Sequence, residues 1–106
     1  MLIRNALAVL TLATAGSALA AVPQISCTGA DDFKAVLKIE HGTGLGTLTY
    51  GYGEDLTTIE DLDTSFVRDC GAATKGNEVL FVVTPVGNKR VGQLILDGKT
   101  RILSCR

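Results

Sequence analysis

The sequence predicts a small all-β domain: an antiparallel meander of five or six strands that closes into a barrel or a two-layer sandwich. Three observations predict it. Apolar residues alternate with polar ones in several segments, glycine-rich turns separate these segments, and a cysteine stands near each end of the domain. Strands joined by tight turns pair antiparallel, and a sheet this apolar must bury one face. We expect at most one short helix and one disulfide bond.

The first twenty residues have the composition of a signal peptide. Arg4 supplies a positive charge, a short apolar run follows, and Ala-Leu-Ala at 18–20 fits the small-x-small pattern of a cleavage site. This run is shorter than the roughly 20 apolar residues that cross a membrane. We therefore expect a signal peptide over 1–20, a single domain over 21–106, and no membrane span. The predicted location is the periplasm or the extracellular space.

Three cysteines, Cys27, Cys70 and Cys105, are candidates for disulfide bonding, because exported proteins fold in an oxidising compartment. A Cys27–Cys105 bond would tie the first strand of the domain to the last, and we favour it. A Cys70–Cys105 bond is the alternative. The Gln-Ile-Ser sequence before Cys27 partly fits a lipoprotein acylation site, but an acceptable ordinary cleavage site precedes it, which disfavours a lipid anchor at Cys27.

The first two clear strands enclose a glycine-rich turn. In 33–40, apolar residues occupy nearly every second position, which is typical of a half-buried strand. In 46–52, Leu48, Tyr50 and Tyr52 share one face. The segment 41–44 supplies the glycines that tight hairpin turns need. A phosphate-binding loop is excluded, because β-prone residues rather than a helix N-terminus follow these glycines.

The acidic segment that follows is the one place where a helix competes with a strand. Within 56–66, apolar residues recur at intervals of three and four, and Thr57 with Glu60 fits a capping box. This pattern favours a short helix, with a strand as the alternative. The small and polar residues of 71–77 predict a loop.

The C-terminal third predicts three more strands. A valine-rich run from Val79 is the candidate central strand, with Pro85 limiting its far end. Asp97-Gly98 between two apolar runs is a strong hairpin signal. We expect a four-residue loop there, because it would face Leu94 towards Leu103, whereas a two-residue turn would set Leu94 beside Arg101.

Little in the chain suggests catalysis or metal binding. His41 is the single histidine, and no nucleophile-elbow motif accompanies it. Asp61-x-Asp63 lacks the glycine of a calcium loop. The slightly acidic composition argues against nucleic acid, and the lack of Trp against a sugar-cleaving site. We therefore predict a protein that is not an enzyme and has no metal, cofactor or nucleic-acid partner.

The binding candidates are two tyrosines and three acids. Tyr50 and Tyr52 would form a flat patch suited to an interface if exposed, and the alternative places both rings in the core. Glu60, Asp61 and Asp63 would attract a basic partner. The leading hypothesis is an exported module that binds a protein or an envelope polymer, as an inhibitor or envelope accessory. The second is an envelope assembly component that acts through exposed strand edges, and a small hydrolase ranks last.

In outline, the chain resembles the small exported lysozyme inhibitors of bacteria. Cys27 at the start of the domain, Cys105 near its end and the meandering strands between them carry this resemblance, which covers architecture only. It implies an antiparallel β-barrel. The family's Ser-Gly loop and its Trp-containing strand are absent, so no inhibitory residue is transferred to this chain.

Overall fold

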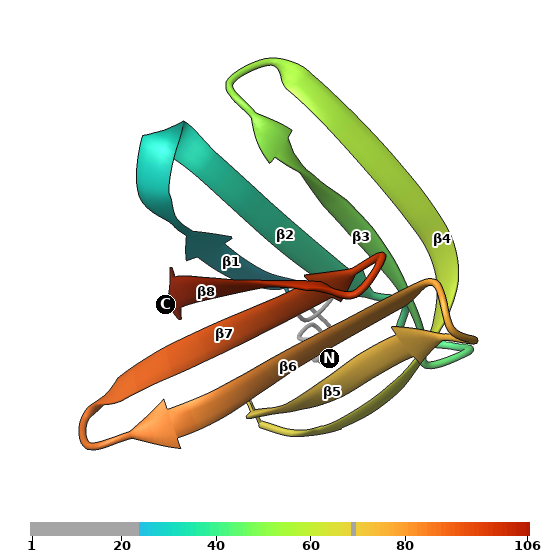
Figure 1. The fold of residues 1–106 in the computed structure, drawn as a ribbon. Helices are drawn as coiled ribbons and strands as arrows, with labels where there is room; N and C mark the ends of the chain where they lie inside the picture. Colours follow the sequence, from blue (N-terminus) through green and yellow to red (C-terminus); the bar gives the residue numbers. More distant parts are fainter. Residues whose placement is uncertain (1–23, 69) are drawn as a thin grey trace, which may run out of the picture.

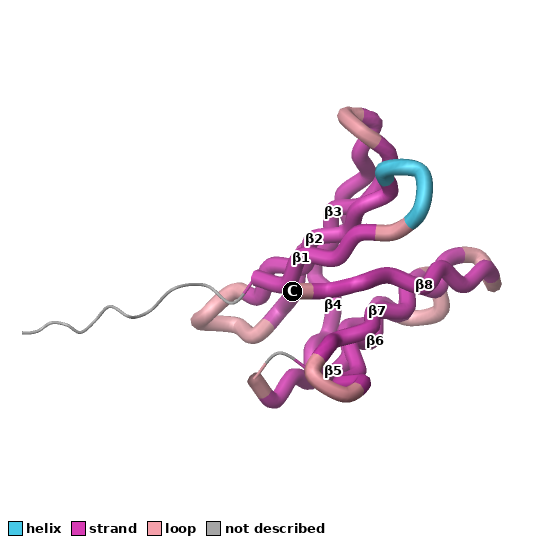
Figure 2. Tube along the Cα trace, turned by 90° about the vertical axis from the view of Figure 1, so that its left-hand side faces the viewer, coloured by secondary structure: helices cyan, strands magenta, loops and turns pink. Residues whose placement is uncertain are grey.

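A computed structural model shows residues 24–68 and 70–106 as a closed antiparallel barrel of eight strands (Figure 1). The strands follow one another in chain order, and the last returns to pair with the first. Figure 2 shows one short helical turn, in cyan, beside these strands. The elements are β1 (Gln24–Thr28), η2 (Ala30–Asp32), β2 (Phe33–Ile39), β3 (Leu45–Tyr52), β4 (Asp55–Val67), β5 (Cys70–Lys75), β6 (Val79–Val86), β7 (Lys89–Leu96) and β8 (Lys99–Cys105). The predicted all-β meander is confirmed, and it takes the barrel form.

The interior is filled by apolar side chains from all eight strands. An eight-stranded barrel is just wide enough for side chains to fill it, so the alternating inward residues of each strand meet at the centre. The largest fully buried side chains are Phe81, Leu37, Leu48, Leu62, Leu94 and Cys27. Burial of these residues is the main source of stability of the barrel.

The barrel closes through a short seam between β1 and β8. Among the described residues, two pairs form this ladder, Cys27 with Cys105 and Thr28 with Ser104. The backbone N–H of Arg106 adds a hydrogen bond to the carbonyl of Ser26 at 3.0 Å. A disulfide joins Cys27 to Cys105 across the seam. The favoured pairing is therefore confirmed.

The structure bears on membrane attachment but not on the signal peptide. The predicted signal peptide, 1–20, lies outside the described residues. Among the residues that the structure describes, no helix is long and apolar enough to cross a membrane. The Sγ atom of Cys27 is bonded to that of Cys105, so it is not available for the thioether of a lipid anchor.

The helix favoured over 56–66 is wrong, because this segment lies within strand β4. Gly46 of β3 pairs with Leu62 and Leu48 pairs with Ile59, so one residue of β3 faces two of β4. The extra residue is a β-bulge at Glu60 and Asp61, and Asp61 adopts a φ of 63°. Because the bulge adds a residue, Ile59 and Leu62 both face inward although three positions separate them. A bulged strand thus imitates helical spacing.

The loop expected over 71–77 is also wrong in most of its length, because β5 occupies Cys70–Lys75. Its small side chains are what the packing requires. Ala73 is fully buried and pairs with Phe81, whose ring fills the interior beside it. The sequence pattern therefore misses β5, because this strand lacks large apolar side chains. With β4 and β5 added, the six predicted strands become eight.

The β7–β8 hairpin has a two-residue turn rather than the expected four-residue loop. Leu96 pairs with Lys99, and Leu94 pairs with Arg101. Asp97 and Gly98 have φ values of 50° and 77°, the two positive values that a type I′ turn needs. The right-handed twist of the flanking strands favours this turn. Arg101 and Lys99 consequently share the inward face of β8.

Gly92 leaves room for the disulfide inside the barrel. A β-carbon at this position would lie 2.7 Å from Sγ of Cys105 and 3.3 Å from Sγ of Cys27. We expect Gly92→Ala to lower the free energy of unfolding by about 1–3 kcal/mol, as overpacking of a filled core does. Urea unfolding measures this loss. The loss should shrink when Cys27 and Cys105 are both alanine, and an equal loss in both backgrounds would contradict the steric explanation.

Candidate functional site

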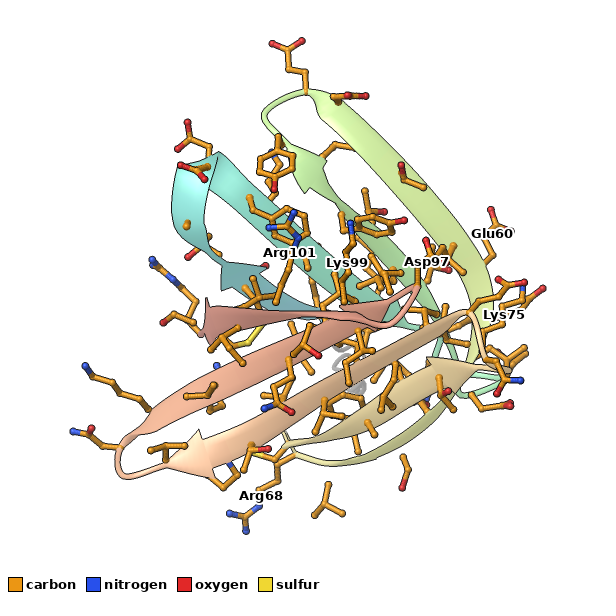
Figure 3. The ribbon with its side chains drawn as sticks, in the orientation of Figure 1. Glu60, Arg68, Lys75, Asp97, Lys99 and Arg101 are labelled. Carbon is orange, nitrogen blue, oxygen red and sulfur yellow. A yellow bond between two sulfur atoms is a disulfide. The ribbon has the colours of Figure 1, made fainter. Side chains whose placement is uncertain are left out.

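A cleft lies at one end of the barrel, between the β3–β4 and β7–β8 hairpins. Its volume is about 340 Å³. Figure 3 shows Lys99 and Arg101 rising from β8 towards β2 and β3. We call this site the mouth cleft. Its aromatic and cationic residues are Phe33, Tyr50, Tyr52, Lys99 and Arg101.

Three aromatic rings form one wall of the mouth cleft. Phe33 pairs with Tyr52 across β2 and β3, and strand alternation places Tyr50 on the same inward face. The rings of Phe33 and Tyr52 meet edge to face with centroids 5.1 Å apart, and the Phe33 and Tyr50 centroids are 6.3 Å apart. Tyr50 packs against the core, whereas Tyr52 is 42% exposed. The tyrosine pair therefore divides between the core and the surface.

The guanidinium of Arg101 covers this aromatic wall. Its Cζ atom lies 4.5 Å from the ring centroid of Phe33 and 5.1 Å from that of Tyr52. A cation within about 6 Å of a ring centroid is attracted by the negative face of the ring. The contact joins β8 to β2 and β3 at the end of the barrel where β8 lacks a β1 partner. Arg101 itself remains exposed.

The rim of the mouth cleft carries both signs of charge. Lys99 and Arg101 belong to β8, Asp97 lies in the β7–β8 turn, and Asp55 begins β4. All four side chains are exposed, so solvent and salt screen their mutual interactions. The cleft combines aromatic surface with hydrogen-bond donors and acceptors. Such a combination suits the recognition of a polar chain that also carries apolar groups.

The acidic residues predicted as a binding surface lie outside the mouth cleft. Glu60, Asp61 and Asp63 are exposed on β4. Glu60 and Asp61 line a separate hollow of about 380 Å³ together with Lys38. The Nζ atom of Lys75 donates a hydrogen bond of 2.9 Å to the backbone carbonyl of Glu60. The fold therefore assigns the tyrosines and these acids to different surfaces.

The other chemically reactive side chains lie apart from one another. Within 24–68 and 70–106, no three His, Cys, Asp or Glu side chains gather as a metal site. His41 is exposed in the β2–β3 turn, where Oγ1 of Thr43 donates to the carboxylate of Glu40 at 2.8 Å. Cys70 is a free, half-buried thiol. The absence of catalysis stays a prediction.

Three residues of the mouth cleft escape prediction from the sequence: Phe33, Lys99 and Arg101. Phe33 reads as an ordinary core residue, because alternation shows only that it faces inward. The signal for Arg101 is the Asp97-Gly98 dipeptide, whose two-residue turn places this arginine opposite Leu94. Arginine is rarely fully buried without a partner. An arginine on the inward face of a strand therefore indicates a position near an open end of the barrel, where solvent reaches the side chain.

The fold and the cleft define a class, a small disulfide-closed β-barrel with a cleft at its mouth. The chain matches no protein-family model, and no curated protein or solved structure is significantly similar to it.

Proposed function

We propose that the protein is an exported, non-catalytic module that binds another macromolecule through the mouth cleft. The observation that carries this proposal is the exposed aromatic and cationic cluster of Tyr52 and Arg101. Tyr and Arg, together with Trp, are enriched among the residues that dominate binding energy at interfaces. An inhibitor or an accessory protein of the envelope is the form of function that we favour.

Two further features support this proposal. A disulfide is typical of proteins from an oxidising compartment, which agrees with the leader-like composition of the first twenty residues. The aromatic wall is also held in place before any partner arrives, because Phe33 is buried and Arg101 stacks on its ring. A preorganised site loses less conformational entropy on binding.

Capture from an envelope extract by the immobilised protein tests the proposal. Tyr52→Ala and Arg101→Gln are each expected to reduce the captured partner about tenfold or more, as the loss of a dominant interface residue does. Arg101→Lys keeps the charge but loses the planar stacking group, so we expect an intermediate loss. Mass spectrometry of the captured proteins and polymer analysis provide the readout.

The matched control is Val67→Ala, which removes an exposed apolar side chain from the far end of β4. It should leave capture unchanged. Circular dichroism checks that each variant keeps the fold. Capture that is equally strong with the Tyr52→Ala/Arg101→Gln double variant would refute the mouth cleft as the binding site.

One observation favours a second candidate function, envelope assembly through strand edges. Between Asp55 and Leu62, β4 pairs with β3 alone among the described strands. An unpaired strand edge is a template for another strand. Oligomers that grow with protein concentration in light scattering would favour assembly over partner binding.

A further inference from the structure

One edge of the first half of β4 lacks a neighbouring strand. β4 pairs with β3 from Asp55 to Asp63, but with β5 only from Asp63 to Val67. The bulge at Glu60 and Asp61 bends β4 at the point where the two pairings meet, because a bulge increases local bend and twist. Among the described strands, none pairs with the other edge of 55–61. This free edge is about 20 Å long at the usual rise per strand residue.

The free edge is accessible and already accepts a hydrogen bond. Residues 55–58 and Glu60 are exposed, and Ile59 is half-buried. The ammonium group of Lys75, at the end of β5, donates to the backbone carbonyl of Glu60 (Figure 3). A side chain here supplies one donor where a neighbouring strand would supply a series of them. The contact is exposed, so an incoming strand can displace it at low cost.

The charges on the free edge indicate which strand would fit. Asp55 and Glu60, five positions apart, flank four uncharged residues, 56–59. Glu54, Asp61 and Asp63 extend the acidic ends. Opposite charges on facing residues stabilise a strand pair, and like charges destabilise it. The complementary strand has two basic residues separated by four uncharged, β-prone ones.

A second copy of the same edge is a poor match. In an antiparallel pair, facing residues direct their backbone groups in the same way, so two identical edges pair about a residue rather than between two residues. A centre at Thr57 sets Glu54 against Glu60, and a centre at Thr58 sets Asp55 against Asp61. The acids therefore oppose self-pairing while they attract a basic segment.

The free edge also borders the mouth cleft. Asp55 and Thr57 are two positions apart and therefore lie on the same, inward face of β4. They line the cleft opposite Asp97 and Lys99 of the β7–β8 hairpin. We propose that the β4 edge binds an extended, basic polypeptide segment by strand addition, with one face of that segment turned towards the mouth cleft. This inference rests on the proposed function, because it names the class of partner. Backbone hydrogen bonds would supply affinity and the acids specificity.

A synthetic hexapeptide, acetyl-Lys-Thr-Val-Thr-Val-Lys-amide, is the probe that tests strand addition to the β4 edge. Amide hydrogen exchange of the full chain is measured by NMR with and without the peptide. We expect exchange of the amides on the free edge within 55–60 to slow about tenfold or more at saturation, as amides that gain a strand partner do. A peptide with Glu in place of both Lys should not slow it. Unchanged exchange with the Lys peptide would overturn the inference.

N-methylated peptides separate strand addition from side-chain binding. Only alternate amides of a strand face its neighbour, so methylation of one alternate set should abolish binding and methylation of the other set should not. Equal effects of both sets would overturn strand addition. Asp55→Asn/Glu60→Gln should weaken binding of the Lys peptide several-fold, whereas Asp31→Asn, an exposed acid in η2, should not. Equal weakening by both would reject the acids as the source of specificity.

The two proposals fail separately. If capture depends on Tyr52 but the Lys peptide does not protect the β4 amides, strand addition is overturned and the mouth cleft is kept as a binding site. Protection of β4 by the peptide without Tyr52-dependent capture overturns the proposed function and keeps the edge as a peptide site. A peptide-free dimer with a protected β4 edge would show that the occupant is a second copy.

Discussion

Replacement of both Cys27 and Cys105 with alanine is expected to lower the free energy of unfolding by about 4–5 kcal/mol. The two cysteines are separated by 78 positions, and a loop of this length carries a loss of that size in the chain-entropy model of disulfides. The seam offers little to replace the bond, since β1 and β8 share two residue pairs. Small domains commonly have a stability of about 5–15 kcal/mol, so the variant should be close to unfolding. Equilibrium unfolding in urea measures the difference.

Cys70→Ala is the matched control, because it removes a thiol that forms no disulfide. Its side chain is half-buried, so we expect a change of about 1 kcal/mol or less. Wild-type protein treated with reductant should behave like the double variant. If the double variant and Cys70→Ala unfolded at the same urea concentration, the seam would not depend on its disulfide.

Phe81→Ala should cause a loss of similar size, about 3–5 kcal/mol, through the core rather than the seam. Phe81 is fully buried and is the largest of the completely buried side chains. It pairs with Ala73 on one side and with Leu94 on the other, so its removal leaves a cavity between three strands. Small neighbours such as Ala73 cannot fill that space. Urea or thermal unfolding provides the measurement.

Phe81→Leu keeps the prediction testable if the alanine variant does not fold. Leucine retains much of the volume, so the expected loss falls to about 1–2 kcal/mol. Val67→Ala, at a side chain that is 78% exposed, should change stability by no more than about 0.5 kcal/mol. Equal losses at the buried and the exposed position would contradict the packing described for the interior.

Local patterns predict much of this barrel. The alternation of apolar and polar residues in 33–40 and 46–52 predicts β2 and β3 correctly. In a half-buried strand every second side chain faces inward, so apolar residues recur at every second position. Asp97-Gly98 marks a hairpin. The pairing of Cys27 with Cys105 follows from their places near the two ends of the domain.

Other parts escape prediction for identifiable physical reasons. The bulge at Glu60 and Asp61 shifts the inward face of β4 by one residue, and a local window reads the resulting spacing as helical. β5 is built from small residues because Phe81 takes up the space beside Ala73, which only the neighbouring strand reveals. Hydrophobic pattern alone therefore misleads where a partner strand decides the conformation.

The mouth cleft is the least predictable part, because it depends on closure of the barrel. Arg101 meets Phe33 and Tyr52 only when β8 returns to the beginning of the sheet. The register of the β7–β8 turn then decides whether Arg101 or Leu103 pairs with Leu94. The role of Tyr50 and Tyr52 in binding stays a prediction that the capture experiment tests.

The disulfide at the seam also has a mechanical consequence. If Gln24 and Arg106 were pulled apart, the tension would pass from Cys27 to Cys105 through one covalent bond. The 77 residues between these cysteines would carry no load, so the rest of the barrel would be shielded from stretching. After reduction the same pull would peel β1 and β8 away from their neighbours and unzip the wall strand by strand.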